Sequence, residues 1–125
     1  MKNMKPKALV FVIALSLFAI VQVVAEISEA EARAHLKSGA RVVDVRTVEE
    51  YQAKHLTNVV NIPLAEVKEK FPQLVTNKNE VVLLHCRSGR RSGMAEAQLR
   101  AMGYTNVFNI GSFEKAEKIL SATDK

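Results

Sequence analysis

The chain has a single cysteine, Cys86, and three arginines follow it within five positions. The surrounding stretch, residues 81–93, reads VVLLHCRSGRRSG and contains no acidic residue. The thiolate is the reactive form of cysteine, and both nearby positive charge and the amino end of a helix favour it. The pattern therefore indicates a reactive thiol that works on an anionic partner. The competing interpretations are an inert buried cysteine and arginines that only keep a loop solvated.

The segments around Cys86 must place it at the end of a strand. Residues 80–85, EVVLLH, contain four successive apolar residues without alternation, which is typical of a strand buried on both faces of a parallel sheet. Helical spacing resumes at Ser92, so residues 86–91 are expected to be the turn between strand and helix. In open α/β sheets, ligands bind at the carboxyl ends of strands, where the next helix presents unpaired amide groups.

This loop is the candidate active site. Cys86 is the expected nucleophile, and small residues in the loop would let its amide groups converge on an anion. The residues expected to contact that anion follow the cysteine directly; they are Arg87, Ser88, Gly89, Arg90, Arg91 and Ser92. Among the arginines, Arg91 and Arg87 are the favoured contacts, and Arg90 is expected to point to water.

Two chemistries use a strand, a cysteine loop and a helix, and the spacing separates them. Cysteine phosphatases and arsenate reductases need an arginine six positions after the cysteine, where it forks onto a tetrahedral oxyanion. Here Ser92 occupies that position and Arg91 comes one residue earlier. The tighter loop favours sulfur transfer, in which an ionised thiol takes up one extra sulfur atom without a separate base. Phosphatase or arsenate reductase activity remains the disfavoured alternative.

The rest of the chain alternates short helices and strands. Two capping boxes, at Ser28–Glu31 and Thr47–Glu50, predict helices that run to about residues 37 and 53. Further strands are predicted at 41–46, 58–63 and 106–110, and further helices at 64–71, ending at Pro72, at 92–102 and at 113–121. Strands alternating with helices over short loops predict a single α/β domain with a mainly parallel central sheet flanked by helices.

Residues 1–25 differ in composition from the remainder. A basic start is followed by residues 8–25, which carry no charge and end in Val23-Val24-Ala25. This is the layout of a cleavable secretory signal peptide. We therefore expect export, with residues 26–125 as the functional domain and the periplasm as its compartment. The alternative is a retained membrane anchor, because a run of 18 uncharged, mostly apolar residues approaches the length that spans a bilayer.

Composition also excludes some functions. The formal net charge is +5, but three lysines and no acidic residue lie in residues 1–25, so the remaining domain is nearly balanced. The chain has no tryptophan and no basic stripe with interleaved aromatics, which argues against nucleic-acid binding. One cysteine and three scattered histidines do not make a zinc cluster, so no metal or cofactor is expected. Any contact with a membrane would come only through an uncleaved leader.

Together, four motifs over residues 28–115 resemble the single-domain rhodaneses, a family of thiosulfate sulfurtransferases with a periplasmic type among them. They are VVDVRTVEEY, KHLTNVVNIP, the loop LLHCRSGRRS and LRAMGYTNVFNIGSF. Lys54, Asn58 and Ser112 depart from the family pattern, because glycine or a small residue usually stands at these positions.

The resemblance implies a persulfide on Cys86 and a rhodanese-like fold. It implies transfer of sulfane sulfur from thiosulfate, or a similar small anionic donor, to cyanide, a thiol or a protein acceptor. A sulfur carrier that delivers persulfide sulfur to a partner protein is the alternative. Resemblance and position also suggest a structural frame of hydrogen bonds and ion pairs behind the loop, formed by Asp44, Arg46, Glu50 and His55.

Overall fold

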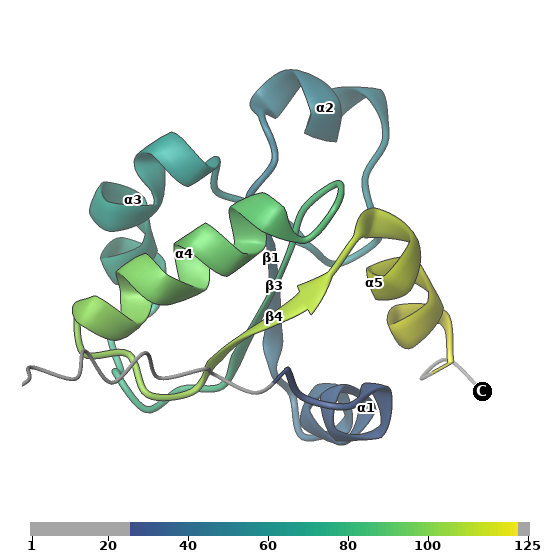
Figure 1. Cartoon of the computed structure of the whole chain (residues 1–125), viewed down its shortest axis with the longest axis horizontal. Helices are drawn as coiled ribbons and strands as arrows, with labels where there is room; N and C mark the ends of the chain where they lie inside the picture. Colours follow the sequence, from purple (N-terminus) through teal and green to yellow (C-terminus); the bar gives the residue numbers. More distant parts are fainter. Residues whose placement is uncertain (1–25, 123–125) are drawn as a thin grey trace, which may run out of the picture.

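The computed structural model describes residues 26–122 (Figure 1). The expected signal peptide, residues 1–25, lies outside the described residues. Helices and strands alternate along the described chain; in order they are α1 (Glu29–Lys37), β1 (Arg41–Asp44), α2 (Val48–Ala53), β2 (Val60–Asn61), the 3₁₀ turn η1 (Leu64–Glu66), α3 (Val67–Leu74), β3 (Val82–His85), α4 (Arg90–Ala101), β4 (Val107–Gly111) and α5 (Phe113–Ser121). Within these residues no helix is both long and apolar enough to cross a membrane.

The sheet has four strands in the order β2-β1-β3-β4, and all neighbouring strands are parallel. Asp44 at the end of β1 pairs with His85 at the end of β3, and His85 pairs in turn with Gly111 at the end of β4. The carboxyl ends of the central strands therefore meet at one edge of the sheet. The predicted α/β domain with a mainly parallel sheet is confirmed.

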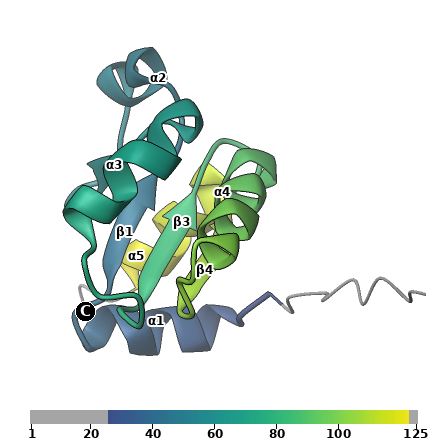
Figure 2. The same ribbon diagram turned by 90° about the vertical axis from the view of Figure 1, so that its left-hand side faces the viewer.

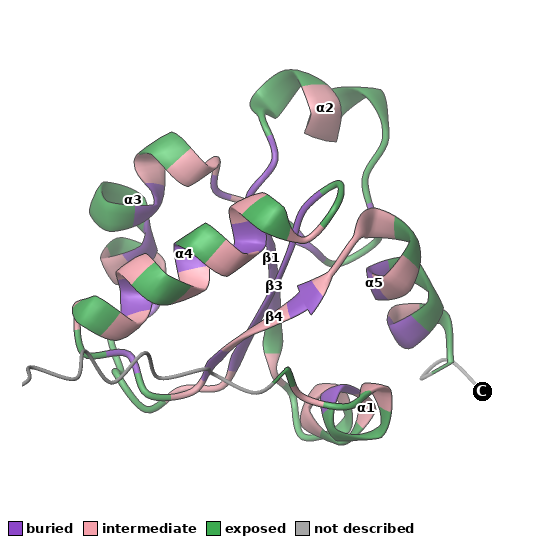
Figure 3. Cartoon of the chain, in the orientation of Figure 1, coloured by how far each residue is buried: buried purple, intermediate pink, exposed green. Residues whose placement is uncertain are grey.

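Helices cover both faces of the sheet. Helices α3 and α4 lie on one face, and α1 and α5 lie on the other (Figures 1 and 2). On the first face α3 and α4 pack against strand side chains such as Val43 and Leu84; on the second, α1 and α5 pack against Val42 and Leu83. Side chains alternate between the faces of a strand, so β3 is buried throughout (Figure 3).

The two capping boxes form as predicted. The Ser28 hydroxyl accepts from the Glu31 amide at 3.1 Å, and the Glu31 carboxylate accepts from the Ser28 amide at 3.3 Å. Thr47 and Glu50 repeat the arrangement at the start of α2. These bonds satisfy amide groups that otherwise lack a partner in the first turn of a helix. The start of each of these two helices could therefore be recognised from the sequence.

Several boundaries differ from the prediction: strand β1, predicted to residue 46, ends at Asp44, and three further differences concern β2, α3 and the cysteine loop. The strand predicted at 58–63 contains only the two residues of β2, and Asn58 takes a left-handed conformation with φ 62°. The helix predicted to stop at Pro72 continues to Leu74, because α3 buries Val67 and Phe71 completely in the core. This burial offsets the hydrogen bond that a proline removes from a helix.

The last difference concerns the cysteine loop. Helix α4 begins at Arg90 and not at Ser92, with Gly89 as its N-cap at φ 95°. A left-handed conformation is open to glycine at little cost, so the chain turns into the helix two residues early. Arg90 and Arg91 therefore lie in the first turn of α4, and the loop itself is short.

Candidate active site

Cys86 directly follows β3, at the carboxyl end of the sheet and on the face covered by α4. Its sulfur accepts a hydrogen bond from the Gly89 amide at 3.0 Å and lies 3.3 Å from the Ser92 hydroxyl. The side chain is fully buried at the bottom of the loop. The loop thus forms a small cup of donors around one sulfur atom.

These donors lower the pKa of the Cys86 thiol from its ordinary value. Burial alone raises this pKa, because it disfavours the charged form. The Ser92 hydroxyl and amide and the amides of Gly89 and Ser88 act in the opposite direction, and their combined effect is the larger one. Gly89 is the N-cap of α4 and Ser92 lies in its first turn, so the helix end that the sequence pointed to supplies much of this effect.

Two backbone hydrogen bonds connect the cysteine loop to the end of β4 and the start of α5. The Cys86 amide donates to the Gly111 carbonyl at 3.2 Å, and the Phe113 amide donates to the Arg87 carbonyl at 3.2 Å. Gly89 packs closely here, because a Cβ at this position would lie 3.2 Å from the Gly111 Cα. At the same junction Ser112 caps α5 by accepting from the Lys115 amide at 3.1 Å. The departure from glycine at 112 therefore supplies a helix cap.

Asn109 of β4 is the residue of this site that the sequence did not reveal. Its side chain bonds to Ser92 at 2.7 Å, to the Gly89 carbonyl at 2.9 Å and to the Gly111 amide at 2.8 Å. Its backbone amide donates to the Glu96 carboxylate. An asparagine inside an apolar strand segment was the one signal that could have drawn attention to it.

The three arginines have different surroundings. Arg91 forms a two-pronged ion pair with Glu50, with oxygen–nitrogen distances of 2.6 and 3.0 Å. Hydrogen bonding to Arg91 lowers the pKa of Glu50 to about 2, against the opposing effect of burial. Arg87 and Arg90 are exposed and form no ion pair with any residue between 26 and 122.

Asp44 and Arg46 form a buried pair beneath the loop. The Arg46 guanidinium donates to the Asp44 carboxylate at 2.7 and 2.9 Å and to the Lys54 carbonyl at 2.6 Å. It also lies 4.8 Å from the centroid of the Phe113 ring. The pair connects the end of β1 to the end of α2 and the start of α5, so both residues stand where a structural frame was expected.

His85 points to the face of the sheet opposite Cys86, as the alternation of strand side chains predicts. Its ring is fully buried, its Nδ1 donates to the Cys86 carbonyl at 3.3 Å, and its Nε2 lies 3.8 Å from the Asp44 carboxylate. Burial lowers the pKa of His85, with the Asp44 charge opposing that effect. This environment suits a packed neutral imidazole and not a base for the thiol.

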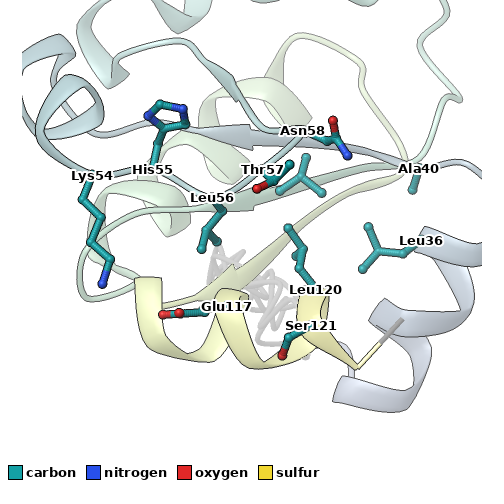
Figure 4. A pocket seen from close by; sticks show the side chains of 11 residues that line it. Leu36, Ala40, Lys54, His55, Leu56, Thr57, Asn58, Glu117, Leu120 and Ser121 are labelled. Carbon is teal, nitrogen blue, oxygen red and sulfur yellow. The ribbon is translucent and has the colours of Figure 1, made fainter. Parts of the chain in front are cut away.

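His55 is not brought to the cup. It is exposed, stacks on the Tyr51 ring at 4.1 Å between centroids, and donates to the Tyr51 carbonyl at 2.8 Å. It borders a groove of about 500 Å³, whose floor includes Leu36, Leu56 and Leu120 (Figure 4). The groove lies on the face of the sheet covered by α1 and α5, and Cys86 does not line it.

The comparisons with known proteins agree with this geometry. Residues 28–118 match the family model of the rhodanese-like domain. The chain is 46% identical over 72 residues to the thiosulfate sulfurtransferase PspE of Escherichia coli, covering 58% of this chain and 69% of that protein. It is 41% identical over 69 residues to YrkF of Bacillus subtilis, a candidate sulfur carrier protein, covering 55% of this chain but only 36% of YrkF.

Solved structures show the same relationship. A rhodanese with anions from E. coli superposes with a TM-score of 0.59 at 43% identity, covering 61% of this chain and 89% of that one. The human single-domain sulfurtransferase TSTD1 superposes with a TM-score of 0.61 at 27% identity, covering 74% of this chain and 95% of that one.

The chain belongs to the rhodanese-like domain family. Its relatives in that family include a thiosulfate sulfurtransferase and a candidate sulfur carrier protein.

Proposed function

We propose that this protein moves sulfane sulfur from thiosulfate, or a similar anionic donor, to cyanide or a thiol through a persulfide on Cys86. The observation that carries the proposal is the cup itself: the Gly89 amide and the Ser92 hydroxyl converge on the Cys86 sulfur, at 3.0 and 3.3 Å. Donors in this arrangement stabilise negative charge on sulfur in both the thiolate and the persulfide. The similarity to a thiosulfate sulfurtransferase supports the same activity.

The chemistry balances in two steps. The Cys86 thiolate attacks the outer sulfur of thiosulfate, a sulfur–sulfur bond forms to the cysteine, and sulfite leaves with the electron pair of the broken bond. Cyanide then attacks the outer sulfur, thiocyanate leaves, and the thiolate is restored. No base is required if the thiol is already ionised, and its lowered pKa favours that state.

A persulfide on Cys86 would bring the transferable sulfur atom closer to an acceptor, although the thiol itself is buried. The cysteine side chain is buried, so a bulky acceptor would have difficulty in reaching its sulfur directly. A second sulfur bonded to it stands about 2 Å further from the cysteine. The transferable atom would thus lie nearer the mouth of the cup than the atom that holds it.

Donor binding is best assigned to Arg87, with Arg90 as a second contact. Arg91 was favoured on sequence, but its guanidinium is held by Glu50, and its charge is therefore partly neutralised. Arg87 and Arg90 flank the cup, are exposed, and form no ion pair among the described residues. Both side chains are available to a small anion.

The proposal is tested by the mass of the intact protein after incubation with thiosulfate. We expect the mass to rise by one sulfur atom in the native protein and to stay unchanged in Cys86→Ser. A native protein that is folded and reduced but gains no sulfur would contradict the persulfide.

The sulfur carrier is the second candidate, and the similarity to YrkF favours it. It shares the persulfide with the first candidate but predicts slow release to cyanide and fast release to a partner protein. The phosphatase alternative is weaker, because the Ser92 hydroxyl occupies the position where such a loop needs its arginine.

We further propose that residues 1–25 direct export and are removed, which gives a periplasmic protein; a membrane-anchored protein is the alternative. The support is the basic start, the uncharged run and the small residues before position 26. Amino-terminal sequencing of the protein recovered from cells tests this. A chain that starts at Glu26 in the periplasmic fraction agrees with the proposal, and a chain retaining residues 1–25 in the membrane fraction contradicts it.

A further inference from the structure

Asn109 joins three parts of the molecule that meet at the cysteine. Its side chain contacts the loop at the Gly89 carbonyl, α4 at the Ser92 hydroxyl, and the end of its own strand at the Gly111 amide, at distances of 2.7 to 2.9 Å. Two of these partners carry the donors that lie on the Cys86 sulfur. The same side chain therefore holds both donors in place.

The orientation of the Asn109 amide is set by its neighbours. The Gly111 amide can only donate, so the Asn109 oxygen must face it; the Gly89 carbonyl can only accept, so the Asn109 nitrogen must face that group. The oxygen is consequently the atom presented to Ser92. The Ser92 hydroxyl therefore faces two acceptors, the side-chain oxygen of Asn109 and the sulfur of Cys86.

A hydroxyl group has a single proton, so Ser92 can donate to only one of these acceptors at a time. When Cys86 is a thiol, Ser92 can donate to Asn109 while accepting from the S–H group. When Cys86 is a thiolate, the same proton can turn to the sulfur. Asn109 is not then left unpaired, because its oxygen keeps the Gly111 amide. The arrangement allows Ser92 to follow the charge of the sulfur without any buried polar group losing its last partner.

We propose that Asn109 is a positioning residue for Cys86, acting through the Gly89 backbone to keep the loop amide on the cysteine sulfur, and holding the Ser92 hydroxyl when its proton is not on the sulfur. Asn109 makes no contact with the sulfur itself among the hydrogen bonds of residues 26–122. It sets the geometry of the groups that do. The inference concerns the ionisation of the thiol and does not depend on which sulfur donor the protein uses.

Charged and titratable groups also lie around the cup, and substitution of Asn109 leaves them all present. They come from the loop, from both flanking helices and from the strand ends; they are Arg87, Arg90, Arg91, Glu96, Glu50, Asp44, Arg46, His85 and Lys115. A change in thiol ionisation on substitution of Asn109 is thus attributable to the amide and the groups it holds.

The test is a titration of the thiol, followed by the ultraviolet absorbance of the thiolate in the purified protein. The Cys86→Ser protein serves as the blank for tyrosine ionisation. Asn109→Ala should raise the midpoint by about one pH unit, the size expected for one displaced hydrogen bond. Asn109→Leu keeps the approximate size of the side chain, removes its hydrogen bonds and adds no charge, so it should raise the midpoint about as far. The Leu variant keeps the test available if the Ala variant does not fold.

Asn106→Ala is the matched control, because Asn106 precedes the same strand and its amide donates to the Asn79 carbonyl at 2.7 Å, away from the cysteine. It should cost stability without moving the thiol midpoint. In a Ser92→Ala background, Asn109→Ala should raise the midpoint at least as far as in the native background, because the Gly89 route remains and no Ser92 proton is freed for the sulfur. Unchanged midpoints in both folded Asn109 variants, or no effect of Asn109→Ala without Ser92, would overturn the inference.

Discussion

Glu50 of α2 and Arg91 of α4 form a two-pronged ion pair at 2.6 and 3.0 Å, although 41 positions separate them in the chain. The pair fastens α2, which projects beyond the carboxyl ends of the strands, to the first turn of the helix that follows the cysteine (Figure 1). Glu50 is also part of the capping box of α2. The Glu50 carboxylate thus takes part in capping α2 and also holds that helix beside the cup.

This pair predicts a specific dependence of stability on pH. The pKa of Glu50 falls from 4.5 to about 2 in the folded protein, so its contribution to stability is complete above pH 4.5 and is lost as the pH falls toward 2. Because the pair is partly exposed, we expect Glu50→Gln to cost only about 1 kcal/mol at neutral pH. Chemical denaturation should show this difference shrinking toward zero at acid pH. A difference that is the same at both ends of the range would contradict the role given to the pair.

The buried pair beneath the loop should matter more for stability. Asp44→Asn leaves the charge of Arg46 without its carboxylate partner in a site where both side chains are almost fully buried. We expect the free energy of unfolding to fall by about 3 kcal/mol, because breaking a buried pair strands one charge. The control is Glu29→Gln, which removes a partly exposed partner from Arg33 and should cost less than about 0.5 kcal/mol. Equal losses in the two variants would be inconsistent with a structural frame at Asp44.

Donor binding separates the arginines. Arg87→Ala should raise the KM for thiosulfate about fivefold with little change in stability, as expected for the loss of about 1 kcal/mol of anion binding. Arg33→Ala is the control: it removes one positive charge from α1, away from the cysteine loop, and should leave the KM for thiosulfate unchanged. An unaltered KM in Arg87→Ala would remove that side chain from the donor site.

The lowered pKa of Cys86 predicts the pH dependence of the first chemical step. The thiolate is the attacking form, so the rate of sulfur uptake should rise with pH and level off below 9.0, the ordinary pKa of the thiol. Ser92→Ala removes one donor and should move this rise to higher pH. Stopped-flow measurement of sulfite release at limiting thiosulfate would follow both proteins. Identical profiles would show that the serine does not stabilise the thiolate.

The parts of the fold that follow local rules were predictable. Each capping box is a contact between residues three positions apart, and the apolar run before Cys86 needs only its own composition to be identified as a buried strand. The order of helices and strands followed from these signals. The position of Cys86 at a strand end followed from them too.

The bonds that complete the site are not local. Asn109 lies 20 positions from Gly89 and 17 from Ser92, and the only local signal for it is a polar residue inside an apolar strand segment, which does not identify its partners. The pairing of Arg91 with Glu50 depends on the position of α2 beyond the carboxyl ends of the strands, so from the sequence alone the Arg91 charge looked available to a substrate. The early start of α4 depends on the left-handed conformation of Gly89, and that in turn on its close packing against Gly111.

The central claim is that Cys86 carries sulfur from an anionic donor to an acceptor. Its most direct test is the release of thiocyanate by the purified protein supplied with thiosulfate and cyanide, measured beside Cys86→Ser. We expect release by the native protein and none by the variant, with both proteins showing the same folded circular dichroism spectrum. Release that persists in Cys86→Ser, or its absence from a folded and reduced native protein, would contradict the account.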